Sequence, residues 1–209
     1  MSVRIHDTAL VEDGVNLGAG TSVWDNAHLR APSRIGSDCI IGGKSYIAYG
    51  VEIGDRVKIN AFVYICYGVT IETGVFIGAG TVFTNDRFPR ACDPDLKQLQ
   101  TSAPTEETLD TCVRKGATIG ARALIGPGLT IGQFAMVGMG AVVTRDVGDF
   151  HMVAGHPAKT IGYVCRCGEP FARFSDAPLD ISEATCGCGR SYTVRDGIVC
   201  ETTVAGAAA

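Results

Sequence analysis

The chain has 209 residues, 46% of them hydrophobic, and a formal net charge of −4. This composition excludes an intrinsically disordered chain, and the charge gives no reason to expect nucleic acid as a partner. No apolar run reaches the roughly 18 residues of a membrane span, and residues 1–10 lack the apolar core of a signal peptide. We therefore expect a cytoplasmic protein with no membrane partner.

From the N-terminus onward, an aliphatic or aromatic anchor recurs at every sixth position. This register runs from Ile5 to Phe83, and after a gap it returns from Val113 to Val143. A six-residue period matches neither a helix nor a flat strand, but it is typical of hexapeptide solenoids. The position four after each anchor is small or β-branched, and glycine, which tolerates positive φ in turns, often follows the anchor.

One strand and one corner per six residues close after three faces, so one coil takes 18 residues and successive strands stack in parallel. The anchors fill the axis, and ligands must bind outside. We predict an all-β fold in which residues 1–162 form a parallel β-helix of about seven coils.

The period is interrupted once. After Phe83 the next anchor is due at residue 89, but it comes 24 residues later, at Val113. The segment 84–112 is polar and contains prolines, and long loops in compact folds are usually functional or disordered. We predict that residues 84–112 form an inserted active-site loop that leaves from a corner.

Residues 18 apart stand above one another in such a fold. One vertical strip, here named the aromatic strip, ends at the start of the inserted loop. Its members are His28, Arg30, Tyr46, Tyr49, Tyr64 and Tyr67. These side chains either cover the strands or a subunit contact, or they form a platform that binds a sugar or a base by stacking and hydroxyl hydrogen bonds.

A second corner carries small residues in coil after coil. They are Gly42-Gly43, Asn60-Ala61, Gly78-Ala79, Gly120-Ala121 and Gly138-Met139. This column is either a row of tight turns or a shallow groove with accessible backbone amides, in which an extended amide-bearing molecule could lie.

Four of the nine cysteines form two Cys-x-Cys pairs, Cys165 with Cys167 and Cys186 with Cys188. Two thiol pairs on glycine-flanked turns are typical of a closed, structural Zn²⁺ site, and a disulfide framework is the weaker interpretation. The usual spacing in such sites is Cys-x₂-Cys, whereas both pairs here are Cys-x-Cys. Binding of iron and a tail without metal are therefore the alternatives to zinc. We predict a zinc-ribbon-like module at 163–201 and a flexible tail at 202–209.

Residues 1–162 resemble the hexapeptide-repeat acyltransferases, whose fold is a left-handed parallel β-helix. Two strings, VFTNDRFPRA at 82–91 and VAGHPAK at 153–159, resemble the branch that N-acetylates nucleotide-linked amino sugars for polysaccharide biosynthesis. The segment 162–169 is similar to a cysteine-bearing tail of some members. The resemblance implies a homotrimer with active sites between subunits and acetyl-CoA in the groove between neighbouring β-helices.

The resemblance also implies site residues. In the branch with Phe-Thr-Asn, the asparagine, here Asn85, points at the reaction centre, and corner turns bind the amides of CoA. The cofactor-binding candidates are Gly120, Ala121, Gly138 and Met139, with Arg145 and Lys159 as partners of the 3′-phosphate or as solvated surface residues. Lys115 is either a partner of a substrate carboxylate or another surface residue.

Acetyl transfer to an amine requires a neutral nucleophile and a destination for its proton. Asn85 cannot serve as a base, but its amide can orient the amine or bind the developing oxyanion. Asp86 either accepts the proton or has a structural role. We expect catalysis mainly by positioning, with the proton passing to water or the departing thiolate.

The predicted function is therefore acetyl-CoA-dependent N-acetylation of a nucleotide-linked amino sugar, with a UDP-linked 3-amino sugar or uronic acid as the favoured class. O-acetylation of a sugar or alcohol would usually want a histidine base, which the sequence does not place. A zinc carbonic anhydrase needs three suitably spaced histidine ligands, and the histidines of this chain, His6, His28, His151 and His156, do not have that spacing. A non-catalytic scaffold would need no inserted loop, so the insertion with Asn85 at its start argues against that alternative.

Overall fold

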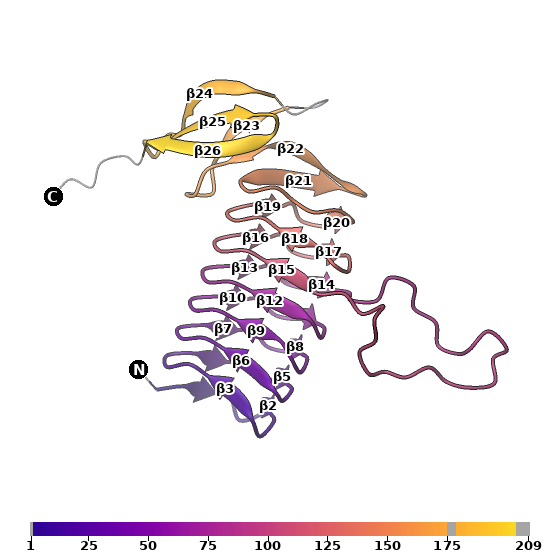
Figure 1. Ribbon diagram of the computed structural model, residues 1–209. Coiled ribbons are helices and arrows are strands. Elements are labelled where there is room, and N and C mark those ends of the chain that lie inside the picture. The colour runs from indigo at the N-terminus through magenta and orange to yellow at the C-terminus, as the bar shows by residue number, and fades with distance from the viewer. Residues whose placement is uncertain (1, 175–178, 204–209) are drawn as a thin grey trace.

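The computed structural model describes residues 2–174 and 179–203. It is a three-sided column of short strands with a long loop leaving one side and a small β-module at the C-terminal end (Figure 1). All regular elements of the described residues are strands. In this part of the chain there is no helix of the length and apolarity that crossing a membrane requires.

Each face of the column is one sheet of parallel strands. The first contains β1 (Arg4–Ile5), β4 (Ser22–Val23), β7 (Ile40–Ile41), β10 (Lys58–Ile59), β13 (Phe76–Ile77), β16 (Thr118–Ile119) and β19 (Met136–Val137). The second contains β2 (Leu10–Val11), β5 (His28–Leu29), β8 (Tyr46–Ile47), β11 (Tyr64–Ile65), β14 (Val82–Phe83), β17 (Leu124–Ile125) and β20 (Val142–Val143). The third contains β3 (Val15–Leu17), β6 (Ser33–Ile35), β9 (Glu52–Ile53), β12 (Val69–Ile71), β15 (Thr111–Val113) and β18 (Thr130–Ile131).

The strand register confirms the predicted 18-residue coil. Ile59 lies opposite Ile41 in β7 and opposite Ile77 in β13. Across the inserted loop, Val82 pairs with Leu124, so one coil plus 24 extra residues separates these neighbours. The seven strands of the second sheet correspond to the predicted seven or so coils. The predicted β-helix and the position of its insertion are therefore confirmed.

The anchors form one continuous apolar axis. From Leu29 to Val143 they are buried, and so are the small or β-branched residues four positions later, such as Thr21 and Cys39. The anchors of the first coil are the exceptions: Ile5 is 45% exposed, and Val11 and Leu17 are half-buried, since no coil lies below them. Side chains thus fill the interior, as predicted, and leave the outer edges for ligands.

The inserted loop leaves after β14 and returns in β15. Isolated bridges join Asp86 to Thr108 and Cys92 to Leu99, so the two arms of the loop run antiparallel as they leave the column. Figure 1 shows the loop projecting sideways from the middle coils. It therefore forms an overhang beside the second sheet.

The C-terminal module grows directly out of the first sheet. β21 (His151–Gly155) pairs in parallel with β19, then β22 (Ala158–Val164) and β23 (Pro170–Arg173) follow antiparallel, while β24 (Ile181–Thr185), β25 (Ser191–Arg195) and β26 (Ile198–Thr203) form a separate sheet. The boundary predicted after residue 162 falls inside β22. The predicted flexible tail starts too early, since residues 202 and 203 belong to β26; residues 204–209 lie outside the described residues.

Candidate functional site

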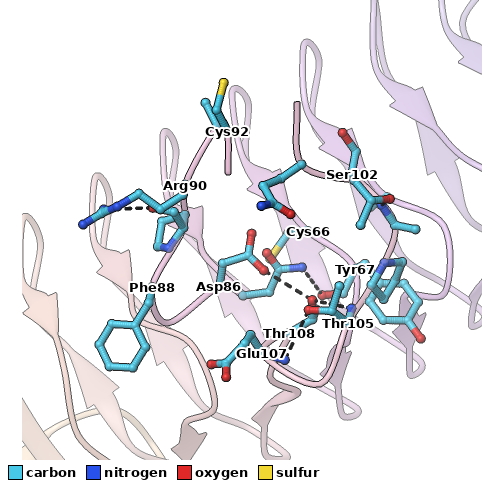
Figure 2. Close-up of a pocket in the computed structure, with 18 of the residues that line it drawn as sticks. Cys66, Tyr67, Asp86, Phe88, Arg90, Cys92, Ser102, Thr105, Glu107 and Thr108 are labelled. Atoms are coloured by element: carbon cyan, nitrogen blue, oxygen red, sulfur yellow. Dashed lines mark hydrogen bonds between the residues drawn. The ribbon is translucent and has the colours of Figure 1, made fainter. Parts of the chain in front are cut away.

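The inserted loop and the second sheet enclose a cleft of about 1000 Å³ (Figure 2). Five members of the aromatic strip line the sheet side, and the first residues of the loop line the floor. These predicted site residues are Arg30, Tyr46, Tyr49, Tyr64, Tyr67, Asn85 and Asp86. The opposite wall comes from the loop itself, from Phe88 to Thr108. Most of the predicted substrate and catalytic residues therefore share one cleft.

The aromatic strip is continuous because consecutive coils place outward side chains directly above one another. The rings of Tyr46 and Tyr64 stack with centroids 5.3 Å apart and planes 9° apart. The rings of Tyr49 and Tyr67 lie 5.2 Å apart, and the Arg30 guanidinium sits 5.4 Å from the Tyr49 ring centroid. The strip offers aromatic faces, hydroxyls and one cation to a ligand.

A carboxylate that the sequence prediction missed holds the lower end of the strip. Glu12 Oε1 accepts hydrogen bonds from Arg30 Nε at 3.1 Å and His28 Nε2 at 3.0 Å, and its Oε2 accepts from the Ala31 amide at 3.0 Å. The Ala31 amide, followed by His28, lowers the pKa of Glu12. Glu12 fixes Arg30 at the cleft. His28, in contrast, is not one of the residues that line the cleft; it bonds to Glu12 and meets the Tyr46 ring edge-on.

Asn85 is anchored through both its backbone and its side chain. Its Nδ2 donates to the Tyr67 carbonyl at 3.1 Å, and its own carbonyl accepts from the Leu109 amide at 2.7 Å. A carbonyl oxygen can only accept, so the nitrogen end of the Asn85 amide is assigned by its partner. The oxygen end, Oδ1, is what Asn85 can offer to a donor in the cleft.

Asp86 is held from the far end of the loop. Thr108 Oγ1 donates to its Oδ1 at 3.3 Å, and the two residues form a backbone bridge (Figure 2). Thr108 could not be predicted as a partner of Asp86, because the six-residue period does not extend into the inserted loop. Nearby, burial raises the pKa of the Cys66 thiol to about 11, with the Asp86 charge adding to the effect. Cys66 is thus a neutral thiol on the cleft floor and not a thiolate nucleophile.

The small-residue edge lies between the first and second sheets and carries Gly120, Ala121, Gly138 and Met139. A Cβ on Gly120 would stand 2.4 Å from the Met139 amide nitrogen, so close stacking of coils already requires glycine there. The Ala121 carbonyl accepts from Gly140, whereas the amides of Ala121 and Met139 donate to no protein acceptor in the described chain. Met139 is 83% exposed. Tight turns and amides without a protein partner in the described chain therefore coexist on this edge.

The other three predicted cations, Lys115, Arg145 and Lys159, stand apart from one another. Lys115 follows β15 on the edge between the third and first sheets, where its amide donates to Glu72, and it is not one of the residues that line the cleft. Arg145 follows β20 on the same edge as Asn85, away from the small-residue edge of its own chain. Lys159 pairs with Ala154, which packs over Gly138, and so lies at the end of the small-residue edge.

The four C-terminal cysteines meet at one point. Their Sγ atoms all lie within 4.8 Å of one another, with Cys165 and Cys188 3.4 Å apart and Cys167 and Cys186 3.6 Å apart. A tetrahedral Zn²⁺ with Zn–S bonds of about 2.3 Å needs sulfurs roughly 3.8 Å apart. The four thiols therefore fit a closed tetrahedral site, and they are the one group of three or more candidate metal ligands in the described residues.

Two matching turns build this cluster. One connects β22 with β23 and the other connects β24 with β25, and in each a glycine three residues after the first cysteine, Gly168 or Gly189, donates its amide to that cysteine's carbonyl at 2.9 or 2.8 Å. Both glycines have positive φ, which favours glycine at this place. Burial disfavours the Cys165 thiolate, but hydrogen bonds from the Cys167 amide and the Tyr192 hydroxyl outweigh burial and bring the pKa of Cys165 to about 7.

Comparison with known proteins agrees with this fold. Residues 50–85 match the family described as bacterial transferase hexapeptide (six repeats), and residues 32–67 and 115–145 match the hexapeptide repeat of succinyl-transferase. Over 89 residues the chain is 40% identical to dTDP-3-amino-3,6-dideoxy-alpha-D-galactopyranose 3-N-acetyltransferase of Aneurinibacillus thermoaerophilus. This match covers 43% of each protein, so it spans less than half the length of the relative.

Two solved structures share the architecture. The UDP-N-acetylglucosamine acyltransferase of Bacteroides fragilis matches with a TM-score of 0.62 at 14% identity, over 78% of this chain and 61% of that one. A variant of GDP-perosamine N-acetyl transferase from Caulobacter crescentus, bound to CoA and GDP-perosamine, matches with a TM-score of 0.50 at 24% identity, over 78% and 57%. The chain is therefore a hexapeptide-repeat β-helix with sequence similarity to a sugar N-acetyltransferase.

Proposed function

We propose that this protein transfers the acetyl group of acetyl-CoA to the amine of a nucleotide-linked amino sugar. The observation that carries the proposal is Asn85, which stands at the root of the inserted loop in a cleft lined by stacked tyrosines and Arg30. The relative that is 40% identical acts, by its name, on a dTDP-linked 3-amino sugar, and this supports a 3-amino sugar as acceptor.

The cleft offers the parts that this reaction needs. The tyrosine faces stack against a sugar or base, and Arg30, fixed by Glu12, pairs with a phosphate. Asn85 Oδ1 accepts a hydrogen from the amine and directs the nitrogen lone pair at the thioester carbonyl carbon. The new C–N bond forms, the C–S bond breaks, and CoA leaves as the thiolate. The amine proton passes to Asp86, to water or to that thiolate.

The candidate residues for the acetyl donor, acetyl-CoA, and those for the acceptor sugar lie on different edges of one chain. The amides of Ala121 and Met139, which have no acceptor among the described residues, suit the amide-bearing arm of acetyl-CoA, and Lys159 at the end of their column suits its phosphates. Asn85, Tyr49 and Tyr67 stand on the next edge, between the second and third sheets, and Tyr46 and Tyr64 lie beside them in the second sheet. A neighbouring subunit would bring one edge against the other, which supports a homotrimer with active sites between subunits.

The test is turnover of acetyl-CoA with a panel of dTDP- and UDP-linked 3-amino sugars, followed by mass spectrometry of the sugar. We expect a singly acetylated product only from the amino sugars. The matched 3-hydroxy sugars distinguish N-transfer from O-transfer, and their acetylation would contradict the proposal. Binding of acetyl-CoA without turnover on any amine would favour a scaffold.

We also propose that the four clustered cysteines hold a structural Zn²⁺. Four thiolates on two rigid turns leave no open coordination position, and the metal would hold the two hairpins of the module together. Atomic mass spectrometry of the purified chain should find about one zinc per chain. Cys165→Ser combined with Cys186→Ser should abolish binding. Cys200→Ser, which changes an exposed cysteine outside the cluster, should not affect it. Absence of zinc from the wild-type protein would refute this assignment.

A further inference from the structure

Tyr192 in β25 stands between the four cysteines and the end of the β-helix. Its side chain is fully buried, and its hydroxyl lies 3.1 Å from Cys165 Sγ. The same hydroxyl accepts a hydrogen bond from the Arg166 amide at 3.2 Å. Tyr192 thus touches both a candidate metal ligand and the turn that carries it.

The direction of the Tyr192 hydrogen bond follows from these two partners. The Arg166 amide occupies a lone pair of the phenol oxygen, so the hydroxyl hydrogen remains for Cys165. When Cys165 is a thiolate ligand it has no hydrogen to donate, and Tyr192 is then the donor. Such a bond fixes the orientation of the ligand sulfur and tunes its charge.

The ring of Tyr192 belongs to an aromatic stack that enters the β-helix. It lies parallel to Phe171 with centroids 4.5 Å apart, and its centroid is 5.6 Å from that of Phe150. Phe150 in turn stacks on Phe134, 5.4 Å away, in the coil beneath. The second buried cluster of the molecule combines Phe150 with Cys165, Cys186 and Tyr192. One apolar unit therefore spans the cysteine cluster and the last coils.

Arg166 makes a second link between the same two regions. This residue lies between Cys165 and Cys167 in the turn, and its guanidinium sits 4.7 Å from the Phe134 ring centroid. Its Nε also pairs with Glu201 at 2.8 Å, and Glu201 binds Arg190 of the other cysteine turn at 2.7 Å. The glutamate side chain is 11% exposed, so it holds both turns together from a mostly buried position.

From this geometry we propose that Tyr192 is a positioning residue for the metal site and couples metal binding to the order of the last coils. The inference rests on the proposed zinc site. At that site, the Tyr192 hydroxyl orients the Cys165 thiolate. The Tyr192 ring and Arg166 hold the cysteine turn against Phe150 and Phe134. The module is then a metal-dependent cap on the end of the β-helix.

Tyr192→Phe tests the hydroxyl alone, because it keeps the stacked ring. We expect its zinc affinity, measured by competition with a chromophoric chelator, to fall about 10- to 100-fold, and the sulfur-to-metal charge-transfer band of the Co²⁺-substituted protein to shift. The matched control is Tyr163→Phe, since Tyr163 is buried in the same aromatic cluster but its hydroxyl has no partner in the described residues. This control should bind zinc as the wild type does.

The outcomes separate the two proposals. Wild-type protein that binds no zinc refutes the metal site itself. Wild-type protein that binds zinc, together with a Tyr192→Phe variant of equal affinity and unchanged cobalt spectrum, refutes the role of Tyr192 and leaves the metal site standing. Loss of affinity in both tyrosine variants alike would show that general packing, and not the hydroxyl bond, is responsible, and would also overturn the inference.

A second measurement uses only the wild-type chain and tests the coupling. Hydrogen exchange is followed with zinc bound and after its removal by a chelator. We expect faster exchange at the amides of Phe134 and Phe150, which bond to the coils beneath at 3.0 and 2.9 Å. The amides of Asp38 and Arg56, which make the equivalent turn bonds to the coil beneath at 2.9 and 2.8 Å in the lower part of the column, should not change. Unchanged exchange at Phe134 and Phe150 would overturn the proposed cap.

Discussion

Replacement of Asn85 by alanine is expected to lower kcat for acetyl transfer by about 100-fold, because the amine then loses the group that orients it. Alanine also removes the bond from Nδ2 to the Tyr67 carbonyl, which ties the root of the loop to the coil beneath. Steady-state kinetics with acetyl-CoA and the best sugar of the panel measure the change. A near-normal kcat would remove Asn85 from the reaction.

The matched control is Asn16→Ala. Asn16 is an exposed residue of β3 in the first coil, far in the stack from the inserted loop. Its loss should leave kcat unchanged, and surface substitutions of this kind typically change stability by no more than about 0.5 kcal/mol. Thermal unfolding of both variants shows whether the column remains intact. Equal losses of activity in the two variants would point to a general effect of removing an asparagine.

Replacement of Ile59 by alanine is expected to destabilise the column by about 2–5 kcal/mol, because truncation leaves a cavity in a close-packed axis. Ile59 is fully buried and pairs with anchors in the coils on both sides. In a solenoid each coil contacts only its neighbours, so a defect in the middle weakens two interfaces. Unfolding in denaturant, followed by circular dichroism, measures the change in midpoint.

Ile5→Ala makes the same chemical change at the same hexad position. Ile5 is 45% exposed and pairs with one neighbour, Val23 in β4. We expect a change within about 0.5 kcal/mol, as for exposed sites in general. Similar destabilisation by both variants would mean that the first coil is packed as tightly as the centre, contrary to the burial seen here.

Much of the site was predictable because it follows the period of the fold. Tyr49, Tyr67 and Asn85 are 18 residues apart, and the structure places them in one column, with the two rings 5.2 Å apart and a hydrogen bond from Asn85 to the Tyr67 carbonyl. The same rule could have found Glu12, which lies 18 residues before Arg30 and binds it. Where neighbours in space are a fixed number of residues apart, spacing in the chain determines contact.

The 18-residue spacing does not predict where a side chain points, or contacts between residues at other separations. His28 belongs to the predicted column, yet its side chain bonds to Glu12 and does not line the cleft. Lys115 was assigned to the substrate because it follows the loop in the chain, but the next corner places it on another edge. Spacing fixes the column in which a residue stands, whereas local hydrogen bonds decide where its side chain turns.

The sequence by itself determined the three-sided column, the position of the inserted loop and the pairing of the four cysteines, because each depends on short, regular spacing. Only the tertiary structure decided that the loop lines one cleft together with the tyrosines, with Thr108 holding Asp86. It alone also placed Tyr192 between the cysteines and the last coils. Those contacts join residues that are not separated by the 18-residue period. They therefore depend on packing and hydrogen bonding in the folded protein and not on spacing in the chain.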